Sequence, residues 1–185
     1  MKRVQFSECG LFRYLLVETW DASKQILPWC LLNPSVAGSE TPEGEIQDDP
    51  TWAKGRGFSR LLGYGGQVFC NPWAYVATDF ADLKRAGYPV GPRNDEAILE
   101  ACAMGDGSII MGYGANARGL SRPAAVLSMI RKAGYRTMAL AVTKDGLPGH
   151  PLYLSYKCRP QPFPALHAKP EGVVMPDGPE ANPTK

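Results

Sequence analysis

Short apolar runs alternate with segments of helical spacing along most of this chain, and this alternation limits the folds that are open to it. Strand-like runs rich in β-branched and aromatic residues cover residues 12–20, 25–34, 67–75, 108–114 and 136–143. Helical spacing, with capping residues and terminal glycines, marks residues 50–65, 78–87, 94–105 and 121–134. Such alternation is typical of a parallel sheet that helices cover on both faces. We therefore predict an α/β fold, a three-layer α/β/α domain with a short, mostly parallel central sheet.

The first two apolar runs predict a separate feature, because only a short turn joins them. Residues 21–24 read Asp-Ala-Ser-Lys, which is a turn composition between two strands. We therefore expect the two runs to form an antiparallel N-terminal hairpin at the edge of the sheet. Pro28 lacks the amide hydrogen that a ladder needs, so it is expected at a bulge or at an edge position.

The composition is that of an ordinary soluble globular protein, with 44% hydrophobic residues, 21% charged residues and a net charge of +2. This charge balance does not by itself indicate a nucleic-acid partner, although it leaves room for a local basic groove. No apolar run reaches the roughly 18 residues of a membrane span. Residues 1–16 also lack the apolar core of a signal peptide. We expect a cytoplasmic monomer with no membrane association.

The domain organisation follows from the distribution of prolines. Residues 1–157 carry all the predicted elements and are expected to form a single α/β domain. Residues 158–185 contain many prolines and few large apolar side chains. We expect this Pro-rich C-terminal segment to be a flexible tail.

Neither a metal nor a cofactor is expected. The five cysteines form no C-x-x-C pair and the chain has two histidines, so we predict reduced, mostly buried thiols and no metal site. Gly112 and Gly114 match the first two glycines of a dinucleotide-binding loop, but Ala117 stands at the third position.

Polar and glycine-rich residues follow the predicted core strands. In parallel α/β sheets, ligands bind beyond the carboxyl ends of the strands, so these residues should crowd one edge. Asn33 and Asn71 each come directly after an apolar run and directly before a proline. An Asn in this position often only opens a turn. Alternatively, Asn33 holds a water or a ligand carbonyl, and Asn71 recognises a nucleobase with its adjacent donor and acceptor.

Two further candidates have both a structural and a functional interpretation. Asp48 and Asp49 precede a predicted helix, where a carboxylate caps the first turn, yet one of them is also a candidate general base. Phe58 lies in an apolar helical pattern that is typical of a core residue, yet it is also a candidate stacking platform for a base.

Residues from the last predicted loop complete the candidate site. His150 follows the last core strand and is either a structural histidine or an acid or cation at the binding edge. Lys144 and Arg93 are candidate phosphate contacts, with Arg118 and Arg122 as other basic residues that spacing alone does not separate from surface charge.

Several motifs in a fixed order resemble one bacterial and phage family. They are "LLNPSVAG", "DDPTW", "GFSRLLGYG", "VFCNPWAYVATDFADL", "GPRND", "IIMGYG" and "TKDGLPGHPLYL". Together they are similar to the domain of unknown function number 1643 over most of residues 10–157. The resemblance brings no established activity.

A more distant resemblance connects the same motifs with the uracil-DNA glycosylase superfamily, whose members are three-layer α/β/α domains. The shared order is strand then Asn-Pro, a helical Phe-Ser, strand then Asn, strand then Gly, and a late His-Pro. The resemblance implies that Asn33 helps to position the attacking water, that Phe58 stacks on the flipped base and that Asn71 reads the pyrimidine edge. It also implies that His150 and Pro151 support the departing base.

The sequence therefore predicts a nucleobase-directed enzyme of the glycosylase-like type, acting on a base in DNA or on a nucleotide. Asn33, Asp49 and His150 are its predicted catalytic residues. Leu32 stands where that superfamily usually has glycine, and acidic residues lie between 40 and 49, where DNA phosphates would pass. Two alternatives therefore stay open: an enzyme that modifies a DNA base without excising it, and a non-catalytic nucleotide- or nucleic-acid-binding module.

Overall fold

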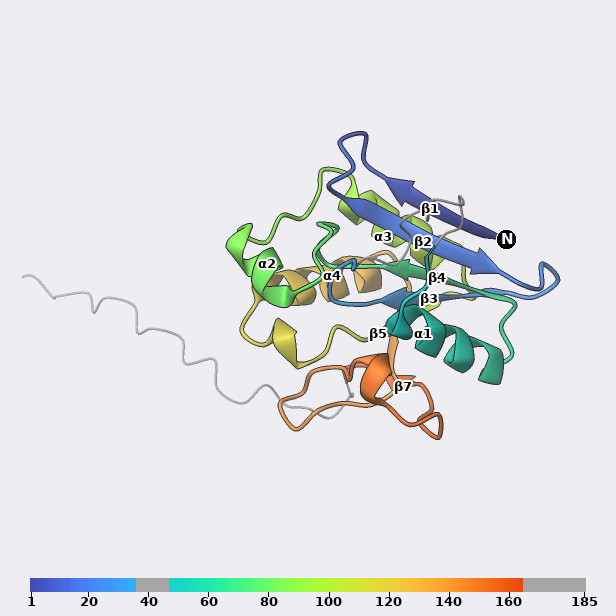
Figure 1. The fold of residues 1–185 in the computed structure, drawn as a ribbon. Coiled ribbons are helices and arrows are strands. Elements are labelled where there is room, and N and C mark those ends of the chain that lie inside the picture. Colours follow the sequence, from blue (N-terminus) through green and yellow to red (C-terminus); the bar gives the residue numbers. More distant parts are fainter. Residues whose placement is uncertain (36–46, 165–185) are drawn as a thin grey trace, which may run out of the picture.

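The computed structural model describes residues 1–35 and 47–164 and contains one seven-stranded sheet with helices packed against it (Figure 1). The strands are β1 (Lys2–Phe6), β2 (Arg13–Thr19), β3 (Ile26–Cys30), β4 (Gly66–Cys70), β5 (Ser108–Met111), β6 (Arg136–Ala139) and β7 (Gln161–Pro162). The helices are α1 (Pro50–Leu61), α2 (Phe80–Arg85), α3 (Asn94–Ala103) and α4 (Ser121–Lys132), with the 3₁₀ helices η1 (Ala115–Ala117) and η2 (Pro151–Tyr153). The fold is thus a mixed α/β fold.

The sheet is parallel at its centre and antiparallel on both sides, in the order β1-β2-β4-β3-β5-β6-β7. Strand β3 pairs in parallel with both β4 and β5, and β5 pairs in parallel with β6. Strands β1, β2 and β7 are added antiparallel to their neighbours. The predicted mostly parallel sheet therefore describes the four central strands and not the whole sheet.

The N-terminal hairpin is made of different strands from those expected. The edge hairpin pairs β1 with β2, whereas β4 separates β2 from β3. Pro28 consequently lies within an interior strand, and the predicted edge position was wrong. The β3–β5 ladder pairs Trp29 and Cys30 but does not extend back to Pro28. The chain entering β5 passes close to the proline ring, because a Cβ on Gly105 would lie 2.6 Å from the Pro28 Cγ.

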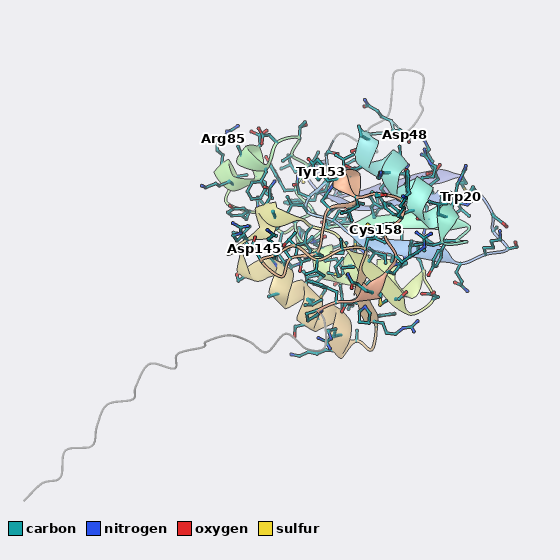
Figure 2. All side chains as sticks on the ribbon, turned by 90° about the horizontal axis from the view of Figure 1, so that it is seen from below. Trp20, Asp48, Arg85, Asp145, Tyr153 and Cys158 are labelled. Atoms are coloured by element: carbon teal, nitrogen blue, oxygen red, sulfur yellow. The ribbon has the colours of Figure 1, made fainter. Side chains whose placement is uncertain are left out.

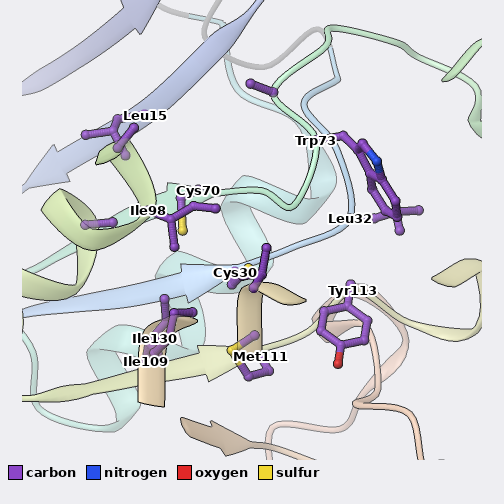
Figure 3. Close-up of a cluster of buried hydrophobic side chains, with 14 of the residues drawn as sticks. Leu15, Cys30, Leu32, Cys70, Trp73, Ile98, Ile109, Met111, Tyr113 and Ile130 are labelled. Carbon is purple, nitrogen blue, oxygen red and sulfur yellow. The ribbon is translucent and has the colours of Figure 1, made fainter. Parts of the chain in front are cut away.

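The buried side chains form two clusters that alternate along the strands. Phe69 of β4 packs with Trp52 and Phe58 of α1, whereas its neighbours Val68 and Cys70 belong to the cluster that includes α3 and α4. Figure 3 shows the second cluster around Cys30, Cys70, Ile98 and Ile130. Because successive side chains of a strand point to opposite faces, helices contribute to the packing of both faces.

A glycine lets α1 lie close to the sheet. A Cβ on Gly55 would lie 2.5 Å from Cζ of Phe69, which is closer than real carbon contacts allow. The missing side chain therefore allows α1 to pack closely against β4.

Side chains cap the starts of α1 and α2, whereas Arg93 and Leu120 stand at the cap positions of α3 and α4 without a capping side-chain bond. The side chain of Asp79 accepts a hydrogen bond from the Ala81 amide and caps α2. Arg93, and not Asn94, occupies the cap position of α3. The Asn94 side chain is instead buried and donates to the carbonyl oxygens of Asn71, at 2.9 Å, and Pro72, at 3.0 Å. Asn94 therefore supports the backbone that follows β4.

The folded unit extends beyond the expected boundary at residue 157. Residues 161–162 form β7 on the edge of β6, and Phe163 is buried in the core. The first residues of the predicted tail are thus part of the sheet, and residues 165–185 lie outside the described part of the chain. Among the described residues, no helix has the length and apolar character needed to cross a membrane.

All five cysteines lie within the described residues and are free. Cys30, Cys70 and Cys102 are buried, Cys158 is half-buried and Cys9 is exposed. Burial raises the pKa of Cys102 to about 12, and a hydrogen bond with Cys30 raises the pKa of Cys70. The thiols of Cys70 and Cys102 are therefore protonated and act as small apolar core groups.

Candidate functional site

A cleft of about 480 Å³ opens where the central strands end. Its walls include residues after β3 (31–33), after β4 (Asn71), after β5 (113–116) and in the loop after β6 (Thr143 and 149–150). Further lining residues come from the start of α1, from Ala77, Thr78 and Phe80, and from η2, which packs beside α1 (Figure 2). The cleft lies at the sheet edge that the positions of Asn33, Asn71 and His150 predict.

Asn33 lines the cleft with its amide orientation held by the backbone. Its Nδ2 donates to the carbonyl oxygens of Ala77, at 2.7 Å, and Pro34, at 3.0 Å. The Ala77 amide in turn donates to the Pro34 carbonyl at 2.9 Å. Both donors of the Asn33 amide are therefore used within the protein, and Oδ1 is the atom that this side chain offers to a water or a ligand donor.

Asn71 is the most unusual polar residue of the cleft. Its side chain is 2% exposed, and within the described structure the buried Oδ1 has no hydrogen-bond partner. A buried acceptor without a partner costs about 1–3 kcal/mol, and such atoms are rare in folded proteins. Because Asn94 anchors the Asn71 carbonyl, the backbone cannot easily move to relieve this cost. The site therefore holds an unused acceptor that a ligand donor would satisfy.

Asp49 lines the cleft and also caps α1. Its Oδ1 accepts from the Trp52 amide at 2.7 Å, and its Oδ2 accepts from the Ser35 hydroxyl. The capping interpretation is thus correct, while the predicted role as a general base stays a prediction. Asp48 binds Lys2 at 2.7 Å and Arg56 at 2.8 Å and is not among the described residues that line the cleft.

His150 brings a neutral imidazole to the cleft. Burial lowers its pKa, and the negative charge of Asp49 opposes this shift in part. In the described part of the chain, its Nδ1 is buried without a hydrogen-bond partner. Gly114 permits this placement, because a Cβ there would lie 3.1 Å from the His150 Cβ. The ring can therefore donate or accept one hydrogen bond toward a ligand without carrying charge at neutral pH.

The lowered pKa predicts an acid-dependent loss of stability. Between the ordinary pKa of 6.5 and the lower pKa of the folded state, the unfolded chain binds more protons, so stability falls as the pH drops through this window. Above pH 6.5 the stability contribution of the neutral His150 side chain is fully present. We expect His150→Gln to flatten the decline of Tm measured by calorimetry between about pH 7 and pH 5. Identical profiles for the two proteins would contradict the assignment.

Three predicted site residues lie elsewhere. Phe58 is 1% exposed and packs in the core against Trp29, at a ring-centroid distance of 6.2 Å, and Tyr156, at 4.8 Å. The apolar face of α1 that carries Phe58 is turned to the sheet, which agrees with the core interpretation of Phe58, while its stacking role stays a prediction. Arg93 is exposed and pairs with Glu96 at 3.5 Å. Lys144 is also exposed and does not line the cleft, whereas the preceding residue, Thr143, does.

Arg13, Ser35 and Tyr153 line the cleft but were not predicted. Arg13 begins β2, which runs antiparallel to β4, so the start of β2 lies at the edge where the parallel strands end. Its side chain is 4% exposed, and burial lowers its pKa to about 10 while Asp49 acts in the opposite direction. Tyr153 is 82% exposed with its ring centroid 5.8 Å from that of His150. The position of Tyr153 after His150-Pro151 was the available sequence signal.

The described residues that line the cleft offer amides, hydroxyls, an imidazole, the Asp49 carboxylate and one guanidinium. In residues 1–35 and 47–164, no group of three or more His, Cys, Asp or Glu side chains is arranged to hold a metal ion. Such a lining suits an uncharged polar ring that can exchange several hydrogen bonds.

Comparison with known proteins gives a family and no activity. No curated protein and no solved structure matches the chain. A family model described as "Protein of unknown function (DUF1643)" matches residues 13–152, which include the cleft residues from Arg13 to His150. The chain therefore belongs to the DUF1643 family.

Proposed function

We propose that the protein is a nucleobase-directed enzyme of the uracil-DNA-glycosylase-like type, which hydrolyses the bond between a base and its sugar. The observation that carries the proposal is a pair of buried atoms in one cleft, Oδ1 of Asn71 and Nδ1 of His150, neither of which has a hydrogen-bond partner among the described residues. The proposal includes two further points. The motif order resembles that of this superfamily, and the domain shares the superfamily's three-layer arrangement.

The base would be held by its edge and its face. Asn71 offers the unsatisfied acceptor Oδ1 and the donor Nδ2 side by side. This acceptor and donor are complementary to a base edge that carries an N–H next to a carbonyl group. They are equally complementary to an edge that carries an amino group next to a ring nitrogen. Tyr153 provides an exposed ring beside His150 and is the candidate stacking surface in place of Phe58.

In the proposed reaction, water adds to C1′ of the sugar and the C1′–N bond breaks. The electron pair of that bond goes to the base, and the proton released by the water balances the charge of the departing base. Asn33 Oδ1 would accept a hydrogen bond from the water, since its Nδ2 is used by Ala77 and Pro34. Neutral His150 would stabilise the negative charge that develops on the base. Asp49 is the candidate acceptor for the water proton, in exchange for its bond with Ser35.

An assay for released base tests the proposal. The full chain is incubated with nucleosides, nucleotides and oligonucleotides that carry uracil or other altered bases, and the products are analysed by mass spectrometry. We expect free base together with a base-free sugar. A changed base mass without release would support a base-modifying enzyme instead. Binding without turnover would support a non-catalytic module, and the absence of any binding would overturn the nucleobase assignment.

A further inference from the structure

The turn that carries Asn71 is held by side chains from two helices. Asn94 of α3 donates from Nδ2 to the carbonyl oxygens of Asn71, at 2.9 Å, and Pro72, at 3.0 Å. Arg122 of α4 donates from Nε to the same Pro72 carbonyl oxygen at 2.9 Å. A carbonyl oxygen has two lone pairs, so these two side chains use both acceptor positions of Pro72.

Arg122 is itself fixed by a second contact. Its Nη2 pairs with Oδ1 of Asp95, the residue that follows Asn94 in α3. The Arg122 side chain is 18% exposed, whereas that of Asp95 is 55% exposed. A guanidinium is planar and carries its donors in a fixed fork, so each of the two contacts restricts the other. The side chain of Arg122 therefore connects the first turns of α3 and α4 with the backbone after β4.

The sequence around Asn71 makes this anchoring effective. Proline has no amide hydrogen, so the carbonyl oxygen is the only backbone group through which Pro72 can be held by a hydrogen bond. Proline also restricts the residue before it to extended conformations. Once the Pro72 carbonyl is fixed, few backbone rotations remain that could turn the Asn71 side chain. The buried Oδ1 of Asn71, which lacks a partner among the described residues, is thereby kept from moving toward one.

We propose that Arg122 is a positioning residue for base recognition, which acts through the Pro72 carbonyl to hold the Asn71 amide in place. The inference rests on the proposed function, because it takes Asn71 as the residue that reads the base edge. Arg122 is not among the described residues that line the cleft, so it acts from outside the cleft. If its hydrogen bond is lost, the peptide plane can pivot about the remaining bond from Asn94. A displacement of about 1 Å in a recognition group is enough to weaken binding or turnover.

The stability of the fold should change little when Arg122 is replaced by lysine. Asn94 still donates to the Pro72 carbonyl, so no buried acceptor loses all its partners. Lysine also keeps a positive charge opposite Asp95, although it lacks the planar fork that reaches both the carboxylate and the carbonyl. The Arg122→Lys variant therefore separates the positioning role from the ion pair between the two helices.

Side-chain amide NMR of the full chain tests the inference without a substrate. The Nδ2 proton signals of Asn71 are identified by their loss in Asn71→Leu. In Arg122→Lys these signals should shift or broaden. The amide signals of Asn33, which is held by the carbonyl oxygens of Pro34 and Ala77, should stay unchanged.

Calorimetric titration then connects the movement of Asn71 with base recognition. The probes are uridine, thymidine, cytidine, adenosine and guanosine. We expect Arg122→Lys to bind the preferred nucleoside about 5- to 20-fold more weakly and to lose its preference over the other nucleosides by a similar factor. A purely structural role would lower the Tm and leave the base preference of the folded protein unchanged.

Arg131→Lys is the matched control, because it makes the same substitution at an exposed position near the other end of α4. It should leave the Asn71 signals and the base preference unchanged, and far-UV circular dichroism should show that each variant is folded. Should Arg122→Lys fail to fold, Asp95→Ala removes the exposed partner of Arg122 and should move the same Asn71 signals by a smaller amount.

The outcomes separate this inference from the proposed function. Unchanged Asn71 signals in the folded Arg122 variant, or in Asp95→Ala where that variant replaces it, would overturn the positioning role whatever the protein binds. A shift of these signals with an unchanged base preference would overturn it as well. If the unchanged protein binds no nucleoside, the proposed function is overturned, and the Asn71 signals still decide whether Arg122 positions this side chain.

Discussion

Replacing Asn71 by leucine is expected to abolish function without harming the fold. Leucine has the same branching at Cγ as asparagine and removes the buried acceptor that has no partner in the described structure. Removing an unsatisfied buried polar group is neutral or stabilising, here by up to about 1 kcal/mol. The same change deletes both groups that would read the base edge. We therefore expect base-dependent turnover to fall by about 100- to 1000-fold, while the free energy of unfolding stays equal or rises.

Asn94 offers a matched control for this result. Asn94 is also buried, but its Nδ2 donates to two carbonyl oxygens, those of Asn71 and Pro72. Asn94→Leu leaves both carbonyls without this donor and should lower the free energy of unfolding by about 2 kcal/mol or more. Urea unfolding of both variants, with the base-release assay on the folded proteins, gives the comparison. A destabilisation of Asn71→Leu as large as that of Asn94→Leu would show that the Asn71 amide has a structural role.

Truncation of Phe58 is expected to lower the stability of the fold, in contrast to the replacement of Asn71. The ring is buried against Trp29 and Tyr156, and α1 carries it toward the sheet. Phe58→Ala should lower the free energy of unfolding by about 3–5 kcal/mol, the range for a buried aromatic ring replaced by alanine. Phe58→Leu keeps much of the volume and should cost less, about 1.5 kcal/mol.

Ligand binding separates the two interpretations of Phe58. If the ring only packs the core, folded Phe58→Leu protein should bind and turn over substrate as the unchanged protein does. If it stacked on a base, Phe58→Leu would lose binding with little loss of stability. Tyr153→Leu is the contrasting variant, since Tyr153 lies exposed at the cleft. It should weaken binding while the free energy of unfolding changes by less than about 0.5 kcal/mol.

Much of the candidate site could be predicted because it depends on strand ends. Asn33, Asn71 and His150 each follow a parallel strand, and parallel strands deliver their carboxyl ends to one edge of a sheet. The positions of these residues after apolar runs were therefore sufficient to bring them to one cleft. The starts of α1 and α2 could likewise be predicted from the sequence, because a cap such as Asp49 or Asp79 binds backbone amides within the first turn of its own helix.

Features that depend on long-range pairing were not predictable in this way. The insertion of β4 between β2 and β3 joins segments that are about 50 residues apart in β2 and β4, and no local pattern records it. That insertion moves Pro28 to the sheet interior and places Arg13 at the cleft. The pairing of β7 with β6 is similarly a contact between distant segments.

The sequence by itself determined the mixed α/β character, the approximate positions of the helices and the meeting of Asn33, Asn71 and His150, because periodicity, capping and strand direction are local properties of the chain. Only the tertiary structure decided the strand order, the burial of Phe58, the position of Arg13 at the cleft and the lack, within the described part of the chain, of a partner for the Asn71 oxygen. These depend on which side chains from distant segments occupy the same space. Whether a buried atom lacks a partner depends on the side chains that the rest of the fold places near it. No single stretch of sequence contains that information.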